Sequence, residues 1–282
     1  MVKHDNKIVP RGPIGVFDSG YGGLTILRDL RNVLPGYDYI YLGDNARAPY
    51  GTRTFDQVYC FTLEAVNKLQ SMGCPLVILA CNTASAKALR TIQQNDLPVS
   101  EDPSRRVLGV IRPTAEYLGT VSHTGHIGVF ATPGTIASGS YDIEIAHQCP
   151  SFKTTGHACP TWVPLIESGK ADSDEADILV KVEVDSLLKE DPEIDTIILG
   201  CTHYPLLYDK IKKVIPEGVT LLSQGAIVAQ SLADYLRRHP EMDNRLSNGG
   251  TCCFYTTGDA QAFGHLATPF MGHCVEAQQL TI

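Results

Sequence analysis

Two cysteines follow apolar runs in similar sequence contexts. Cys81 lies in "LVILACNTASA" (76–86) and Cys201 lies in "TIILGCTHYPL" (196–206). In both stretches a strand-like run stops on the thiol, and polar residues follow at once. A single buried cysteine is commonly an inert apolar side chain. Two of them in matching contexts indicate a shared chemical role.

A pair of thiols in one site suits the inversion of a carbon acid. One thiolate removes a proton from carbon while the other thiol supplies a proton to the opposite face, and both need pKa values near the working pH. A helix start follows each cysteine, with Thr83 as a cap in one case and Pro205 in the first turn of the other. A helix start is expected to lower the pKa of such a thiol. The alternative is one nucleophilic cysteine and one bystander.

Polar residues after other apolar runs are candidates for the same site. The stretch "DSGYGG" (18–23) offers the carboxylate of Asp18 and the hydroxyl of Ser19. Asp18 either tunes a neighbouring thiol or only caps a turn. The glycine spacing is not that of a nucleotide-binding loop. His203, two residues beyond Cys201, either assists proton transfer or makes a structural hydrogen bond.

A second polar segment, "GDNARAPYG" (43–51), also follows an apolar run. It offers Asp44, Tyr50 and Gly51 as ligand contacts. Glu167, in "VPLIESGK", cannot be placed from its spacing alone. The sequence therefore predicts several polar loops at strand ends, which is where ligands bind in open α/β sheets.

Alternating strand and helix patterns must position these residues. The predicted strands are 14–17, 39–42, 76–80, 107–111, 127–131, 196–199 and 219–222. Continuous apolar runs of this kind are typical of parallel strands that are covered on both faces. A capping box at 54–57 opens a helix that Gly73 is expected to end, and 172–175 opens another. The apolar side of the second helix is expected to hold Ile178, Leu179, Val182 and Leu187.

The chain carries a faint internal repeat. "IGVFDSGYGG" begins at Ile14 and "IGVFATPGTI" begins at Ile127, and each unit passes through helical patterns to a strand that ends on a cysteine. The order of elements predicts an α/β fold made of two similar α/β domains with mainly parallel sheets. The two thiols then approach a ligand from opposite sides, so we expect the active site in the interdomain cleft.

Composition limits the function classes. The chain has 282 residues and a net charge of −8, which argues against a nucleic-acid or anionic-membrane partner. No apolar stretch reaches the roughly 20 residues of a membrane span, and the first 13 residues lack the apolar core of a secretory signal. We expect a cytoplasmic protein. Its nine cysteines include no C-x-x-C pair, which makes a zinc site a poor interpretation.

Five motifs together resemble the glutamate racemases of the cofactor-independent aspartate/glutamate racemase superfamily. They are "FDSGYGGLT", "YLGDNARAPYG", "ACNTASA", "LGCTHYPLL" and "FYTTGD". They occur in the family's order and span nearly the whole chain. The resemblance implies interconversion of L- and D-glutamate without pyridoxal phosphate or metal, with the D-glutamate used in peptidoglycan.

The resemblance also implies site residues and domain limits. The catalytic cysteines fall on Cys81 and Cys201, with Asp18, His203 and Glu167 beside them. The implied substrate contacts are Asp18, Ser19, Pro49, Tyr50, Gly51, Asn82, Thr83, Thr202 and His203. The implied first domain comprises 1–112 plus 220–282, the second comprises 113–219, and the protein is expected to be a homodimer. The stretch at 221–229 departs from the family's acid-containing pattern, so Gln224 receives no role.

Three other functions remain open from the residues. An aspartate racemase would use the same chemistry on a shorter substrate. A two-domain amino-acid sensor would bind glutamate without turnover. A cysteine-dependent hydrolase would form an acyl-enzyme and need only one of the two thiols.

Overall fold

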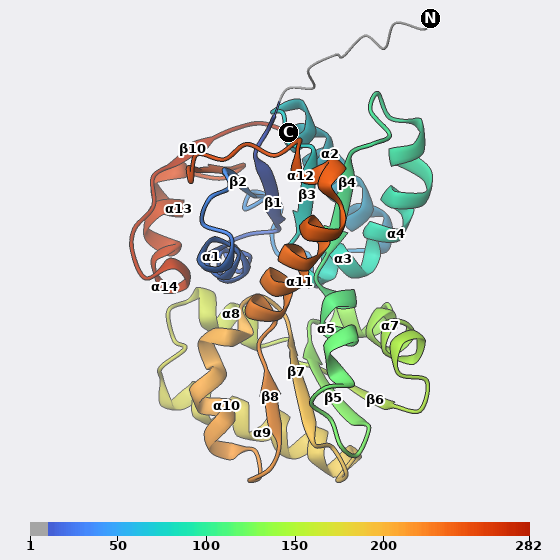
Figure 1. Ribbon diagram of the computed structural model, residues 1–282. Helices are drawn as coiled ribbons and strands as arrows, with labels where there is room; N and C mark the ends of the chain where they lie inside the picture. The colour runs from blue at the N-terminus through green and yellow to red at the C-terminus, as the bar shows by residue number, and fades with distance from the viewer. Residues whose placement is uncertain (1–10) are drawn as a thin grey trace, which may run out of the picture.

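Two parallel β-sheets, one above the other in Figure 1, organise the molecule. The computed structural model describes residues 11–282. The upper sheet has the order β10-β9-β2-β1-β3-β4 and the lower sheet has the order β6-β5-β7-β8, and every adjacent pair is parallel. The predicted α/β class with parallel sheets is therefore confirmed.

The strands divide between the sheets as follows. The upper sheet contains β1 (Ile14–Asp18), β2 (Tyr39–Gly43), β3 (Leu76–Leu79), β4 (Arg106–Gly109), β9 (Cys252–Thr256) and β10 (Ala277–Gln279). The lower sheet contains β5 (His126–Ala131), β6 (Lys153–Ala158), β7 (Thr196–Gly200) and β8 (Thr220–Leu222).

The helices connect these strands. The α-helices are α1 (Leu24–Val33), α2 (Phe55–Ser71), α3 (Asn82–Lys87), α4 (Leu89–Thr91), α5 (Ile111–Leu118), α6 (Pro133–Ala137), α7 (Ser140–Gln148), α8 (Trp162–Glu167), α9 (Asp174–Glu190), α10 (Tyr208–Val214), α11 (Gln224–Arg238), α12 (Pro240–Asp243), α13 (Ala260–Leu266) and α14 (Thr268–Met271). Shorter turns of other helix types are η1 (Ile92–Asp96), η2 (Leu97–Val99) and η3 (Tyr204–Leu207).

All seven predicted strands are present, with small differences at their ends. The largest is in the run 107–111, where the strand stops at Gly109 and Ile111 already begins α5. Strand β6 was not predicted, because its sequence "KTTGHA" is polar. It lies at the edge of the lower sheet and pairs only with β5, so its outer side need not be apolar.

The two predicted helix starts are correct, but one apolar face is wrong. The capping box at Thr54 and Gln57 forms, and α2 ends at Ser71, with Met72 as its C-cap and Gly73 directly after at a φ of +94°. In α9 the buried residues are Ala176, Val180, Val184 and Leu187. Leu187 is buried and Leu179 is partly buried against the core, as predicted, whereas Ile178 and Val182 are 65% and 54% exposed, so the predicted face is wrong at these two positions.

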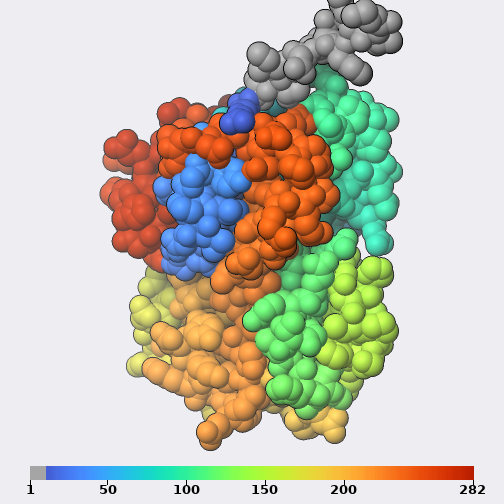
Figure 2. Space-filling model, in the orientation of Figure 1, coloured from blue at the N-terminus to red at the C-terminus, as the bar shows by residue number. Residues whose placement is uncertain are grey.

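Helix α11 lies across the junction between the two sheets. It follows β8 of the lower sheet and packs against α1 of the upper half (Figure 1). Its residues, orange in Figure 2, cover part of that junction on the face shown. The domain limits stay a prediction, but β8 pairs with β7 in the lower sheet. A limit drawn by sheet membership therefore falls after Leu222 rather than after Val219.

Two further expectations concern a secretory signal and a membrane-spanning helix. The prediction that the first 13 residues contain no secretory signal falls almost wholly on 1–10, which lie outside the described residues. Within residues 11–282, none of the helices combines the length and the apolar character needed to cross a bilayer.

Candidate active site

The carboxyl ends of the two sheets bring the predicted residues together. Asp18 ends β1, Cys81 follows β3 next to it, and Cys201 follows β7 of the lower sheet. Thr202 Oγ1 donates to Asp18 Oδ2 at 3.3 Å, which joins the two strand ends directly. Cys81 and Cys201 are only 6% and 7% exposed. Both thiols therefore lie in a nearly closed region between the sheets.

Cys81 caps its own helix. Its sulfur accepts a hydrogen bond from the backbone N–H of Ala84 at 3.5 Å, so the cap of α3 is this thiol and not Thr83 as predicted. Ser19 Oγ lies 3.6 Å from the same sulfur. The expected lowering of the Cys81 pKa is wrong in its net direction. Burial, helped by the negative charge of Asp18, outweighs the helix start and raises the pKa to about 12.

Cys201 has a different set of neighbours. Its sulfur lies 4.0 Å from His203 Nδ1, and His203 Nε2 lies 3.0 Å from Glu167 Oε1. Burial disfavours a charged imidazole, but the contacts with Cys201 and Glu167 outweigh burial and raise the pKa of His203 to about 10. Glu167, which the sequence could not place, thus completes a Cys–His–Glu series at the end of α8. The series can hold a proton next to one thiol.

Asp18 is the buried carboxyl between the two thiols. It is fully buried, and it accepts hydrogen bonds from Gly20 N at 2.8 Å and from Thr202 Oγ1. Burial raises its pKa, and the positive His203 opposes that rise. Asp18 thus caps the turn at Gly20, and its charge also raises the pKa of Cys81, so its position is compatible with both predicted roles.

Three threonine hydroxyls meet beside the cysteines. Thr83 Oγ1 lies 3.0 Å from Thr132 Oγ1 and 3.1 Å from Thr135 Oγ1, and these two lie 3.0 Å from each other. Thr132 and Thr135 stand at the start of α6, in the stretch "ATPGTI" of the second repeat unit. Neither threonine was predicted from sequence, although this stretch aligns with "DSGYGG" and could have identified them. The cluster is a set of donors suited to a carboxylate.

The predicted contacts Pro49, Tyr50 and Gly51 lie near this cluster. Gly51 O accepts from Gly134 N at 2.9 Å, and a Cβ on Gly51 would lie 2.8 Å from Thr132 Cβ. The Tyr50 hydroxyl instead donates to Asp44, so a ligand contact from this segment would use the backbone. Pro49 precedes Tyr50 through a cis peptide bond.

Asn82 is held by residues that the sequence analysis left without a role. Its Nδ2 donates to Gln224 Oε1 at 2.7 Å, and its Oδ1 accepts from Tyr141 at 2.8 Å. Tyr141 comes from α7 of the lower half, and Gln224 begins α11 at the junction. No spacing in the sequence links them to Asn82.

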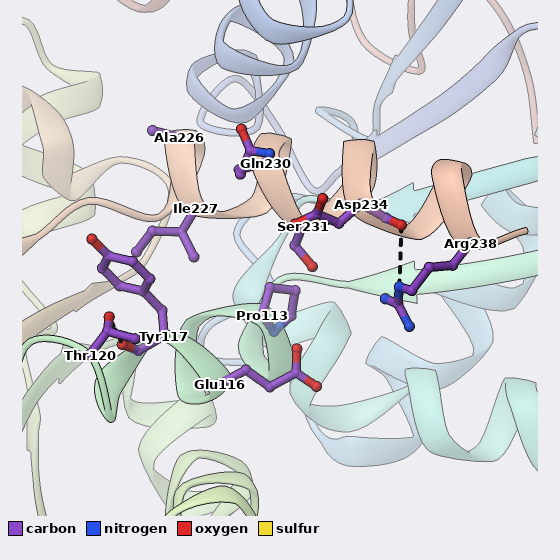
Figure 3. Close-up of a pocket in the computed structure, with 10 residues that line it drawn as sticks. All are labelled: Pro113, Glu116, Tyr117, Thr120, Ala226, Ile227, Gln230, Ser231, Asp234 and Arg238. Atoms are coloured by element: carbon purple, nitrogen blue, oxygen red, sulfur yellow. Dashed lines mark hydrogen bonds between the residues drawn. The ribbon is translucent and has the colours of Figure 1, made fainter.

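Two cavities lie away from these residues. One of about 450 Å³ is lined by α5 and α11, among them Glu116, Tyr117 and Gln230, as Figure 3 shows. A second, of about 690 Å³, adjoins it along α4 and α7. Neither is lined by a predicted site residue, so the interdomain cleft stays a prediction.

One cluster of side chains could hold a metal among residues 11–282. The ligand atoms of His157, Cys159 and Glu183 lie within 4.8 Å of one another. His157 Nε2 and Glu183 Oε2 are 2.6 Å apart, so the imidazole and the carboxylate already satisfy each other. Cys159 is buried in the core, and burial raises the pKa of its thiol.

Comparison with known proteins gives the same family as the motifs. The sequence profile of the Asp/Glu/Hydantoin racemase family matches residues 24–232. The glutamate racemase of Ruegeria sp. (strain TM1040) is 43% identical over 269 residues, covering 92% of this chain and 96% of that protein. A glutamate racemase isoform from Bacillus anthracis has a solved structure with a TM-score of 0.86, 36% identity, and coverage of 96% and 98% of the two chains.

A third relative was solved with an amino acid bound. The glutamate racemase of Francisella tularensis in complex with D-glutamate has a TM-score of 0.82 and 31% identity, covering 96% of this chain and 97% of that one. The sequence and the architecture of these relatives match along almost the whole chain, and the family profile matches residues 24–232. The chain belongs to the Asp/Glu/hydantoin racemase family of isomerases.

Proposed function

We propose that the protein is a glutamate racemase that inverts the α-carbon with two thiols. The observation that carries the proposal is the unequal surroundings of the two cysteines. Cys81 is kept protonated by burial beside Asp18, whereas Cys201 has His203 and Glu167 within reach of its proton. One thiol is thus prepared to give a proton and the other to accept one.

The resemblance to glutamate racemases implies that Cys201 acts on L-glutamate and Cys81 on D-glutamate, and the resting arrangement can supply the Cys201 thiolate. His203 takes the proton of Cys201, and Glu167 stabilises the resulting imidazolium. The Cys201 thiolate removes the α-proton of L-glutamate, and the electron pair stays on carbon. Cys81 then gives its S–H proton to the opposite face, which forms D-glutamate and a Cys81 thiolate. The reverse reaction starts from that thiolate.

The carbanion needs donors that are already in place. Thr83, Thr132 and Thr135 offer hydroxyls, and the start of α3 offers backbone N–H groups. These groups are suited to the carboxylates of glutamate without any basic side chain. Exclusion of water from the closed region strengthens each contact.

Solvent exchange tests the two-thiol scheme. In D₂O, each enantiomer should yield product that carries deuterium at the α-carbon, because the thiol that gives the proton exchanges with solvent. Cys81→Ala and Cys201→Ala should each abolish racemisation. Full racemisation by either variant would contradict the scheme and favour a single-cysteine mechanism.

The substrate is tested against its nearest rival. Side-by-side rates on glutamate and aspartate should favour glutamate, in line with the relatives' names. Glutamate binding without turnover would indicate a sensor, and a mass increase on one cysteine would indicate an acyl-enzyme.

The biological setting forms part of the same proposal. We infer a cytoplasmic homodimer that supplies D-glutamate for peptidoglycan and works without nucleic acid or membrane. The bacterial sources of the relatives support the setting. Light scattering should give twice the 30.6 kDa chain mass, and growth of a strain lacking the protein should require added D-glutamate.

A further inference from the structure

Asn82 and Gln224 belong to a buried ring of hydrogen bonds. Gln224 Oε1 accepts from Asn82 Nδ2 at 2.7 Å, Tyr141 donates to Asn82 Oδ1 at 2.8 Å, and Gln224 Nε2 lies 2.9 Å from the Tyr141 hydroxyl. All three side chains are at most 3% exposed. The ring joins the residue after Cys81 to α7 and α11.

The orientation of every member follows from one backbone carbonyl. Val110 O, which can only accept, lies 3.3 Å from one end of the Gln224 amide. That end must therefore be the NH₂ group, and the oxygen of Gln224 must face Asn82. Asn82 consequently presents its own NH₂ to Gln224 and its oxygen to Tyr141, which must donate. Thr114 reinforces the order, because its hydroxyl donates to Val110 O at 2.8 Å and so accepts from Gln224 at 2.9 Å.

We propose that Gln224, with Tyr141, is a positioning residue that fixes the amide of Asn82 in one orientation beside the reacting cysteine. The proposal rests on the proposed function and on the contact between Asn82 and glutamate that the family resemblance implies. If the Asn82 amide could rotate by 180°, its NH₂ donor and its oxygen acceptor would exchange places. The ring uses one hydrogen and one lone pair of Asn82 and leaves one of each in a fixed place.

Two variants of Gln224 separate orientation from simple packing. Gln224→Met keeps the length of the side chain and removes both polar ends, so Asn82 loses its acceptor. We expect kcat/KM for glutamate to fall by about 100-fold, the scale of a misplaced contact. Thr114→Val is the matched control, because it removes an equally buried partner of Gln224 that does not touch Asn82 and leaves Val110 O and the Tyr141 hydroxyl to accept the two hydrogens of the Gln224 amide. It should retain kcat/KM within about two-fold.

Gln224→Glu supplies a pH signature. The protonated acid can still donate to Val110 O, whereas the ionised form repels that carbonyl and draws the Tyr141 hydrogen away from Asn82. Its kcat/KM, relative to wild type at each pH, should therefore fall as pH rises through the acid's burial-raised pKa. Circular dichroism measures the folded fraction of each variant. Each rate is divided by that fraction, so that it refers to folded protein only.

The outcomes distinguish this proposal from the function on which it rests. Equal losses in Gln224→Met and Thr114→Val, or an unchanged Gln224→Met, would overturn the positioning role while leaving the racemase intact. A wild type that binds glutamate but does not racemise it would overturn the proposed function. In that case, weaker glutamate binding by Gln224→Met than by Thr114→Val would still support the positioning role of Gln224. Equal Kd values for the two variants would refute that role.

Discussion

Cys81 lies at a helix start, which by itself lowers the pKa of a thiol, but burial raises that pKa and keeps the thiol protonated. Ala84 N and Ser19 stabilise the thiolate, but loss of water and the charge of Asp18 act more strongly. The sequence pattern revealed the helix start and could not reveal the depth of burial. Burial depends on how two strand ends from separate sheets face each other.

This protonation state predicts slow alkylation. Because the Cys81 pKa is raised to about 12, iodoacetamide at pH 8 should modify exposed Cys60 well before Cys81. The Cys81 rate should keep increasing with pH up to the raised pKa. Peptide mass spectrometry gives both rates, and equal rates at pH 8 would show that the thiol is accessible and ionised.

His203 predicts a pH-dependent part of stability. Its pKa is raised from 6.5 to about 10, so the stabilisation is complete below the unfolded value near 6.5 and disappears as pH rises through 10. Glu167→Gln removes one of the groups that raise the pKa of His203. Its free energy of unfolding should be lower than that of wild type at pH 6, and the two should converge above pH 10. Urea unfolding measures the gap, and a gap independent of pH would contradict the assignment.

The side chains that could be predicted from sequence are those with a distinctive chemistry at a strand end, such as Cys81 and Cys201. Gln224 could not be predicted in this way. It lies 142 positions from Asn82, and an amide at a helix start has many local uses. Only the junction of α3, α7 and α11 gives it a partner.

At the scale of elements, glycine at the start of α1 allows two loops to meet. A Cβ on Gly22 would lie 2.3 Å from Thr202 Oγ1 and 2.5 Å from His203 Nδ1. The loop after β1 therefore touches the loop after β7 with no space for a methyl group. This contact sets how closely the two halves of the site approach.

Gly22→Ala should accordingly reduce activity. The methyl group must displace Thr202 and His203, and we expect kcat/KM to fall by about 100-fold. Gly36→Ala is the control, because a Cβ there meets no atom within 4 Å. An active Gly22→Ala enzyme would mean that the two loops separate freely before catalysis.

Elements with a strong local pattern were predicted well, and those set by tertiary contacts were not. The capping box of α2 is local and forms as expected. Edge strand β6 is polar, because one side of it has no strand partner. The inward face of α9 depends on how the helix packs against the lower sheet, so Ile178 and Val182 point outward despite their apolar character.

At the scale of the whole molecule, the two sheets share one apolar core, and each sheet also has an apolar cluster of its own. One continuous apolar cluster includes Leu27 of α1, Leu199 of β7, Leu232 of α11 and Trp162 of α8. Through α11, side chains of the upper half pack against side chains of the lower half. Separation of the halves therefore disturbs shared packing, and the halves should lose their structure together.

This shared core predicts a single unfolding transition. Trp162 is the only tryptophan and lies in the lower half, so its fluorescence reports that half, whereas far-ultraviolet circular dichroism reports both. The two urea midpoints should coincide. Leu232→Ala, which leaves a cavity in α11 and costs about 2–5 kcal/mol, should lower both by the same amount. A fluorescence midpoint that differs from the circular dichroism midpoint would instead show that the halves unfold as independent domains, joined by α11 as a hinge rather than by a common core.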